Sequence, residues 1–133
     1  MHLKTIINLS MSKFKRTVVI GASPKPYRYS YKAVKALVQA GHSVTAIGLS
    51  EGSISGVEIT TSHLPVEDVD TVTIYLSPEN QSTVYDYVIK VLSPRRIIFN
   101  PGTENKDFIQ KAMHAGIDAI ENCTLVMLAS GRY

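Results

Sequence analysis

The chain has 133 residues, of which 44% are hydrophobic and 19% charged, a composition typical of one globular domain. Its net charge of +3 is small and its basic residues are dispersed, which argues against nucleic-acid binding and suits a small anionic ligand. One cysteine excludes an internal disulfide and indicates a reducing, cytoplasmic compartment, and no apolar run approaches the length of a membrane helix.

The N-terminal residues 1–12 contain one lysine and an apolar patch that is too short for the core of a signal peptide. We therefore expect them to form an extension outside the fold. Residues 13–133 contain no linker, repeat or low-complexity segment, so we expect them to form a single domain.

The first half of that domain alternates strand and helix patterns. Residues 17–20 are a β-branched run that predicts a strand, and the apolar residues of 31–40 recur at helical spacing. Ser30 is a candidate N-cap for this helix, and Gly41 stands where a C-terminal glycine belongs. The pattern then predicts a strand at 43–47, a glycine- and serine-rich loop at 48–56, and a short strand at 57–59.

The second half continues the alternation. After a turn at 64–68, a strand is predicted at 70–76, and Ser77 and Pro78 indicate the start of a helix that runs to Leu92 with Val84, Tyr87, Val88 and Val91 on one face. A strand at 96–99, a helix capped by Thr103 that runs to Ala115, and a strand at 117–120 follow. The apolar run 123–128 fits either a helical turn or a short strand.

This order of elements with short connections predicts parallel strands, and so an α/β, three-layer Rossmann-like domain with a mostly parallel sheet. In such sheets ligands bind beyond the carboxyl ends of the strands. Four loops follow predicted strand ends, and we expect them to converge on one site: 21–30, 48–51, 77–78 and 100–103.

The loop at 21–30 has the chemistry of a phosphate site. Gly21 lets the backbone approach a ligand closely, although it is also compatible with a simple turn. Arg28 is able to bind a phosphate through two hydrogen bonds, and Ser30 with the following amides forms a helix N-terminus that favours negative charge. Ser23 adds a hydroxyl. Lys25 adds a flexible cation, although taken alone it reads as a solvated surface charge.

The same loop departs from the dinucleotide fingerprint G-x-G-x-x-G. The run from Gly21 to Pro26 contains only the first glycine, and its two prolines stiffen the loop. No acidic residue directly follows the second strand to hold an adenine ribose, because Glu51 comes late. These differences count against a standard NAD site.

An ordered set of motifs nevertheless stands out. It comprises Gly21-Ala22-Ser23 with Pro26, Arg28 and Ser30, then Gly41-His42-Ser43-Val44, Val69-Asp70-Thr71-Val72, the loop from Asn100 to Asn105, and Glu121-Asn122-Cys123-Thr124. This set resembles the CoA-binding domain family, whose small stand-alone bacterial members carry the pattern G-A-S-x-x-P-x-R-x-S. The family is related to the N-terminal domain of the succinyl-CoA synthetase alpha subunit.

The resemblance implies a Rossmann-type domain that binds coenzyme A or an acyl-CoA, with the nucleotide phosphates near the first loop. By this resemblance the first loop supplies Gly21, Ala22, Ser23, Lys25, Arg28 and Ser30, while Ser77, Pro78, Pro101 and Gly102 line the opposite wall. Many members have Asn-Pro after the second strand, where this chain has Gly48-Leu49-Ser50-Glu51, so the resemblance assigns no contact there.

We find no catalytic set and no metal-ligand spacing in the sequence. His42 and His114 follow or end helices, where a histidine often serves as a favourable charge at the helix dipole. Cys123 reads either as a buried core thiol or as a thiol near the cysteamine end of CoA, able to form a mixed disulfide. The three tyrosines of the first loop fit stacking on adenine, a lid or the core: Tyr27, Tyr29 and Tyr31.

The sequence therefore predicts a non-catalytic, cytoplasmic module for CoA or acyl-CoA, with no metal, nucleic acid or membrane as a partner. Two alternatives remain open. One is an NAD(P)-dependent oxidoreductase or sensor of the same fold class, which rests on fold analogy. The other is a subunit that docks on an acyl-CoA enzyme, with its own site vestigial. A homo-oligomer is compatible with all of these.

Overall fold

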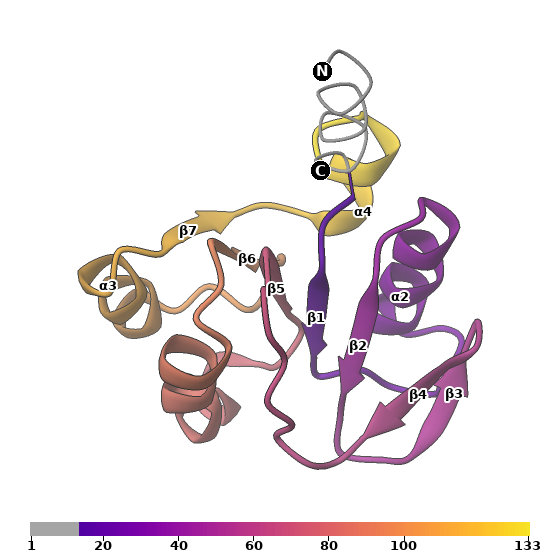
Figure 1. The fold of residues 1–133 in the computed structure, drawn as a ribbon, viewed down its shortest axis with the longest axis horizontal. Helices are drawn as coiled ribbons and strands as arrows, with labels where there is room; N and C mark the ends of the chain where they lie inside the picture. The colour runs from indigo at the N-terminus through magenta and orange to yellow at the C-terminus, as the bar shows by residue number, and fades with distance from the viewer. Residues whose placement is uncertain (1–13) are drawn as a thin grey trace, which may run out of the picture.

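The computed structural model describes residues 14–133, so the extension predicted for residues 1–12 lies outside the described residues. Within residues 14–133, seven strands form one sheet in the order β3-β4-β2-β1-β5-β6-β7 (Figure 1), and only β3 runs antiparallel to its neighbour. The strands are β1 (Thr17–Ile20), β2 (Val44–Ile47), β3 (Gly52–Ile54), β4 (Val57–Thr60), β5 (Thr71–Ile74), β6 (Arg96–Phe99) and β7 (Asp118–Glu121).

Three α-helices and one irregular helix accompany the sheet within the described residues. The α-helices are α2 (Tyr29–Gln39), α3 (Lys106–His114) and α4 (Thr124–Ala129). The irregular helix consists of two 3-10 turns, Pro78–Asn80 and Ser82–Val84, and a π-helical segment, Tyr87–Leu92. None of the described helices is long and apolar enough to cross a membrane.

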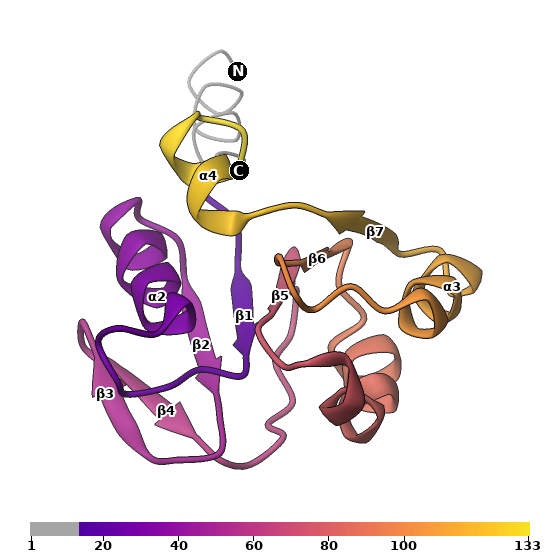
Figure 2. The ribbon, with the colours of Figure 1, turned by 180° about the vertical axis from the view of Figure 1, so that it is seen from behind.

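The helices cover both faces of the sheet, which confirms the predicted three-layer Rossmann-like fold. On one face, the side chains of Val18, Ile74 and Phe99 pack against the irregular helix and against Phe108 of α3. On the other face, Val19, Ala46 and Ile59 pack against α2, and α4 lies beside α2 in both views (Figures 1 and 2). Every residue of β1 and β5 is buried, as expected for parallel strands covered on two sides.

The loop predicted at 48–56 contains a strand instead. β3 pairs with β4 in a hairpin, with Ile54 opposite Val57 and only Ser55 and Gly56 between them. Both turn residues adopt positive φ angles, 49° and 82°, which is the backbone of the tight turns that match the twist of a hairpin. Ile54 is fully buried, so the hairpin contributes to the core although its sequence is rich in serine and glycine.

Two predicted helix caps are wrong. Arg28, not Ser30, occupies the N-cap position of α2, and Ser30 is buried within the first turn. The helix predicted from Thr103 begins at Lys106, because the side chain of Asn105 accepts a hydrogen bond of 3.2 Å from the Phe108 N–H. The Thr103 hydroxyl instead donates to the Asn100 carbonyl at 2.7 Å and closes the loop before the helix.

The irregular helix departs from the predicted apolar face at its end. Val91 is 50% exposed, whereas Leu92 is buried. The π-helical turn explains the shift, since the Ser93 N–H bonds to the Val88 carbonyl at 2.9 Å, one residue further back than in an α-helix. The undecided apolar run 123–128 forms most of α4.

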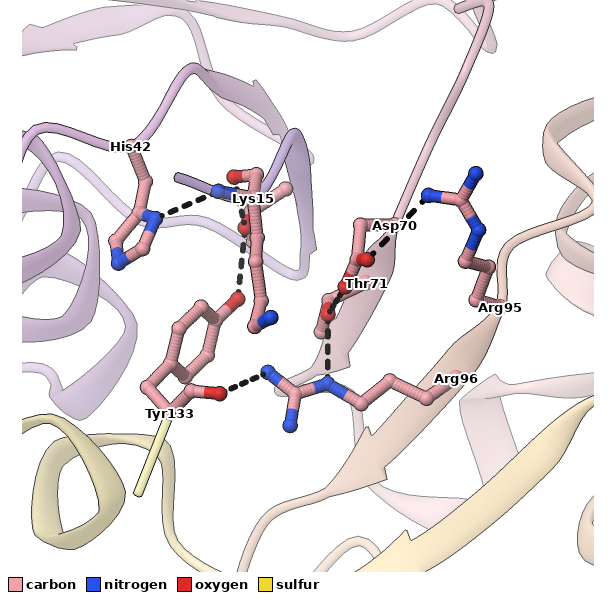
Figure 3. A network of polar contacts seen from close by, with 8 residues as sticks. Lys15, His42, Asp70, Thr71, Arg95, Arg96 and Tyr133 are labelled. Atoms are coloured by element: carbon pink, nitrogen blue, oxygen red, sulfur yellow. Dashed lines mark hydrogen bonds and ion pairs between the residues drawn. The ribbon is translucent and has the colours of Figure 1, made fainter. Parts of the chain in front are cut away.

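At the amino ends of β1, β5 and β6, polar side chains bond to one another (Figure 3). Arg96 is central: its Nε donates to the Thr71 hydroxyl at 2.7 Å, and its Nη2 donates to the main-chain oxygen of Tyr133 at 3.1 Å. The guanidinium carbon also lies 4.6 Å from the centre of the Tyr133 ring. We call this group the amino-edge network; it comprises Lys15, Thr17, His42, Asp70, Thr71, Arg95, Arg96 and Tyr133.

His42 belongs to this network as a neutral side chain. Its Nδ1 accepts a hydrogen bond of 2.9 Å from the Lys15 main-chain N–H, and its ring centre lies 4.9 Å from that of Tyr133. Burial, followed by the positive charges of Lys15 and Arg96, lowers the pKa of His42 below its usual value of 6.5. The interpretation of His42 as a charge at the end of α2 is therefore wrong.

Candidate functional site

The order of strands reverses beside β1, because β2 lies on one side of it and β5 on the other. A pocket of about 730 Å³ lies at the carboxyl ends of these strands. All four loops predicted to converge contribute to it, and so does the connection between β7 and α4. Every predicted site residue except Pro78 lines this pocket: Gly21, Ala22, Ser23, Lys25, Arg28, Ser30, Ser77, Pro101 and Gly102.

The first loop is held in place by main-chain contacts. The N–H groups of Gly21 and Ala22 both donate to the Ile47 carbonyl, at 2.8 and 2.9 Å, so the loop turns across the end of β2. Ser23 Oγ then accepts from the Lys25 N–H at 3.2 Å, and the Arg28 N–H donates to the Lys25 carbonyl at 3.0 Å. These bonds organise the loop from within, before any ligand enters.

Two glycines allow the strand ends to approach each other this closely. A Cβ atom on Gly21, whose φ is +92°, would lie 2.9 Å from the Tyr75 carbonyl carbon. A Cβ atom on Gly48 would lie 2.0 Å from the Ala22 main-chain oxygen. A side chain at either position would push the walls of the pocket apart.

The end of the pocket near α2 is suited to an anion. Lys25 and Arg28 are the only Lys, Arg, Asp or Glu residues of the described chain that line the pocket, and both are exposed. No side chain caps the N-terminus of α2 and its first turn contains no acidic residue. Ser30, at the second position of this eleven-residue helix, faces the pocket, so the positive end of the helix adds to the two cations.

The opposite wall depends on a buried asparagine that the sequence analysis did not single out. Asn100 Nδ2 donates to the Thr73 hydroxyl at 2.7 Å and to the Ile74 carbonyl at 2.9 Å, while Asn100 Oδ1 accepts from the Thr124 N–H at 2.9 Å. These three bonds join the ends of β5 and β6 to the start of α4. An asparagine directly after an apolar strand is the only sequence signal of this role.

Gln81 holds the same wall from the other face of the sheet. It is fully buried, and its Nε2 donates to the carbonyls of Leu76 and Thr103 at 2.9 and 2.8 Å. Asn105 Nδ2 donates to Gln81 Oε1 at 3.0 Å. Gln81 therefore connects the loop after β5 to the loop after β6, and nothing in its local sequence indicates this.

A family model described as "CoA binding domain" matches residues 15–129. The chain belongs to this CoA-binding domain family. No curated protein matches the chain. The family description agrees with the resemblance based on the ordered set of motifs, and the matched range includes every residue of the pocket.

Solved structures resemble the whole CoA-binding domain. One, described as the crystal structure of an uncharacterized protein, is 40% identical, covers 90% of this chain and 98% of its own, and superposes with a TM-score of 0.87. A hypothetical protein from Pyrococcus horikoshii OT3 is 23% identical over 96% of this chain and 89% of its own, with a TM-score of 0.78. Cell-free ID.343 from Thermus thermophilus is 20% identical over 97% and 98%, with a TM-score of 0.80. The last two show the fold alone.

The structure also shows where the cysteine and the three tyrosines considered in the sequence analysis lie in the CoA-binding domain. Cys123 is half-buried and lines the pocket, so it is not a core thiol. Of the three tyrosines, Tyr29 lines the pocket, Tyr31 packs against the core on the α2 face, and Tyr27 is exposed. Among residues 14–133, no group of three or more His, Cys, Asp or Glu side chains is placed to hold a metal ion.

Proposed function

We propose that this domain binds coenzyme A or an acyl-CoA in the pocket at the carboxyl ends of β1, β2 and β5, and that it does so without catalysing a reaction. The observation that carries the proposal is the convergence of the family's first loop, with Arg28 and the start of α2, on a single pocket. Phosphate groups are the part of CoA that this end suits. A guanidinium and an uncapped helix N-terminus both favour multiply charged oxyanions.

The rim of the pocket adds apolar surface beside these cations. Tyr29 is 70% exposed and Leu49 is 91% exposed, and both line the pocket. In this proposal they contact the adenine base, since an aromatic and an aliphatic side chain both pack well on a flat ring. Leu49 stands near the position where many family members have Asn-Pro, so this chain makes its own contact there.

The proposal of binding without chemistry rests on the side chains around the pocket. No histidine, aspartate or glutamate of the described residues lines it. Burial raises the pKa of the Tyr75 phenol well above its usual value of 10.0, so Tyr75 keeps its proton and is a poor general base. Cys123 is the one thiol among the lining residues, and no histidine lines the pocket to activate it or the serine and threonine hydroxyls there.

Isothermal titration calorimetry tests the proposal. We expect saturable heat with CoA and acetyl-CoA, weaker binding of dephospho-CoA, and none with NADH at the same concentration. No heat with any CoA compound would overturn the proposal and favour the docking subunit, whereas binding of NADH alone would favour the oxidoreductase.

Arg28→Ala should weaken CoA binding about 10- to 100-fold, the scale of about 1.5–3 kcal/mol for a hydrogen bond to a charged group. Lys35→Ala is the matched control, because Lys35 is an exposed cation on the same helix and does not line the pocket. Equal losses in the two variants would remove Arg28 from the site and leave only a general effect of net charge.

A further inference from the structure

The pocket has two ends of different chemistry, and the sheet sets their order. The loops of β2 and β1 carry Leu49, Lys25 and Arg28, while the loop of β6 carries Pro101. Between them lies the end of β5, and adjacent strands are about 4.8 Å apart, so the β1 and β6 loops are separated by roughly 10 Å. A ligand that fills the pocket with its phosphates at Arg28 would reach the β6 loop.

The start of α4 closes the β6 end of the pocket. The Thr124 hydroxyl shares a hydrogen bond of 2.8 Å with that of Thr73 on β5, and the Thr124 N–H bonds to Asn100 after β6. These contacts hold Cys123 and Leu125, the neighbours of Thr124, against the pocket.

Four residues present carbon or sulfur at this end, Leu76, Pro101, Cys123 and Leu125, and they lie beside Ser77, Asn100, Gly102 and Thr103. Leu125 is half-buried and does not pack into either core of the sheet, unlike Leu128 in the same helix. The apolar side chain of Leu125 therefore faces the pocket and not the hydrophobic core. Tyr75, which keeps its phenol proton, adds no charge.

Most polar groups at this end already have partners within the protein. The Thr103 hydroxyl donates to the Asn100 carbonyl, and Ser77 Oγ accepts from Asn80 Nδ2 at 2.9 Å. The amide of Asn100 uses both its nitrogen and its oxygen in the three bonds described above. The Gly102 N–H, which the open loop would otherwise present, donates to the Glu104 carboxylate at 2.8 Å. A ligand carboxylate here would find no lysine or arginine among the described residues that line this end.

We propose that the β6 end of the pocket receives the acyl group of an acyl-CoA, and that it selects an uncharged, apolar acyl group over a carboxylated one. This inference rests on the proposed function and adds the class of ligand. The cations at the β1 end bind the phosphates, and the apolar end discriminates among thioesters that share the same nucleotide.

A matched pair of ligands tests the selection. Butyryl-CoA and succinyl-CoA have acyl chains of four carbons that differ in a terminal methyl group or carboxylate. By calorimetry we expect butyryl-CoA to bind roughly tenfold more tightly than CoA, since each buried methylene favours binding about fourfold. Succinyl-CoA should bind at least roughly tenfold more weakly than butyryl-CoA, because its carboxylate would be desolvated without a cation.

Succinyl-CoA that binds as tightly as butyryl-CoA, while CoA itself binds, would overturn this inference and leave the proposed function intact. Absence of binding by CoA and by both thioesters would overturn the proposed function as well. The two failures are therefore distinguishable in one set of titrations.

Leu125→Lys tests the location of the acyl group. A cation at this position should reduce the preference for butyryl-CoA over succinyl-CoA at least threefold, whereas Val126→Lys, on the exposed side of the same helix, should leave the preference unchanged. An unchanged preference in a folded Leu125→Lys protein would overturn the assignment. If that variant does not fold, Pro101→Lys decides, because Pro101 is exposed and lines the same end. A cation there should also reduce the preference for butyryl-CoA, and an unchanged preference contradicts the inference.

Discussion

The two edges of the sheet carry similar residues but serve different purposes. The amino edge contains Arg96, whose guanidinium bonds to Thr71 and to the Tyr133 main chain and lies against the Tyr133 ring. The carboxyl edge contains Arg28, which is exposed and lines a pocket, and whose guanidinium carbon lies 5.6 Å from the centre of the exposed Tyr27 ring. An arginine that is already bonded contributes to stability, and an arginine left open to a cavity is available to a ligand.

The same contrast applies to the termini of the elements. At the amino edge, His42 Nδ1 accepts the Lys15 N–H, so a side chain satisfies a main-chain donor. At the carboxyl edge, α2 begins without a side-chain cap. Helix N–H groups that no side chain satisfies are sites for water or for an anion. The comparison teaches that unsatisfied donors, more than the number of polar residues, distinguish the binding edge from the structural edge.

Substitution of Asn100 should have the largest effect on stability. Asn100 lies in the pocket wall, yet it is buried and its side chain is fully hydrogen-bonded, like the residues of the amino-edge network. Asn100→Ala removes three hydrogen bonds and leaves the Thr124 N–H buried without its partner, which should lower the free energy of unfolding by about 3–5 kcal/mol in urea denaturation. Asn122→Ala, an exposed neighbour of the same pocket wall, should cost less than about 1 kcal/mol. Equal costs would contradict the role given to Asn100.

The two arginines test the comparison directly. Arg96→Ala should lower the free energy of unfolding by about 2–3 kcal/mol, through the loss of two charged hydrogen bonds, and leave the affinity for CoA unchanged. Arg28→Ala should do the reverse, with reduced affinity and unchanged stability. Urea denaturation and calorimetry on both variants check this. A variant that lowers both quantities would show that the edges are coupled.

Gly48 tests whether the closeness of the strand ends matters for the pocket. Gly48→Ala places a Cβ atom 2.0 Å from the Ala22 oxygen, so the first loop must move, and we expect a loss of about 1–3 kcal/mol in stability together with weaker CoA binding. Ser53→Ala, on the exposed face of the adjacent hairpin, is the control and should change neither. Normal affinity in Gly48→Ala would mean that the loop tolerates displacement.

Substitution of His42 should have the smallest effect on stability, and the effect should appear only when stability is measured as a function of pH. Because burial lowers its pKa in the folded state below 6.5, the unfolded chain takes up the proton first as the pH falls. The contribution of neutral His42 to the free energy of unfolding is therefore complete above pH 6.5. It decreases as the pH falls below 6.5, until the pH reaches the pKa of the folded state. His42→Gln should flatten this part of the stability profile, measured by urea denaturation between pH 7 and 5. A profile that keeps its slope in His42→Gln would contradict the assignment.

Much of the fold followed from local patterns. The predicted strands 17–20 and 96–99 match β1 and β6 residue for residue, because a run of apolar, mostly β-branched side chains has few alternatives in a doubly covered sheet. Gly41 follows α2 as predicted, and the N–H groups of Gly41 and His42 bond to the carbonyls of Val38 and Leu37. The convergence of the four loops followed from the rule for parallel sheets.

The errors came where distant contacts outweigh local preference. β3 lies in a segment that was predicted as loop because Ser and Gly are poor strand residues, yet its pairing with the predicted strand β4 and the burial of Ile54 stabilise it. Pro78, predicted for the opposite wall, is not among the residues that line the pocket, although its neighbour Ser77 is, and its contact with a ligand stays a prediction. The roles of Asn100 and Gln81 depend on partners more than twenty residues away in the chain, which no local pattern encodes.

The sequence by itself determined the alternation of strands and helices, the phosphate-type loop and the family, because these depend on side-chain periodicity and on motifs within a few residues. Only the tertiary structure decided which polar groups bond to each other at the amino edge and which remain open at the carboxyl edge. It also brought Leu125 and Cys123 to the end of the pocket opposite Arg28. The physical reason is that satisfaction of a donor, burial of a side chain and the shape of a cavity are properties of contacts between segments far apart in the chain.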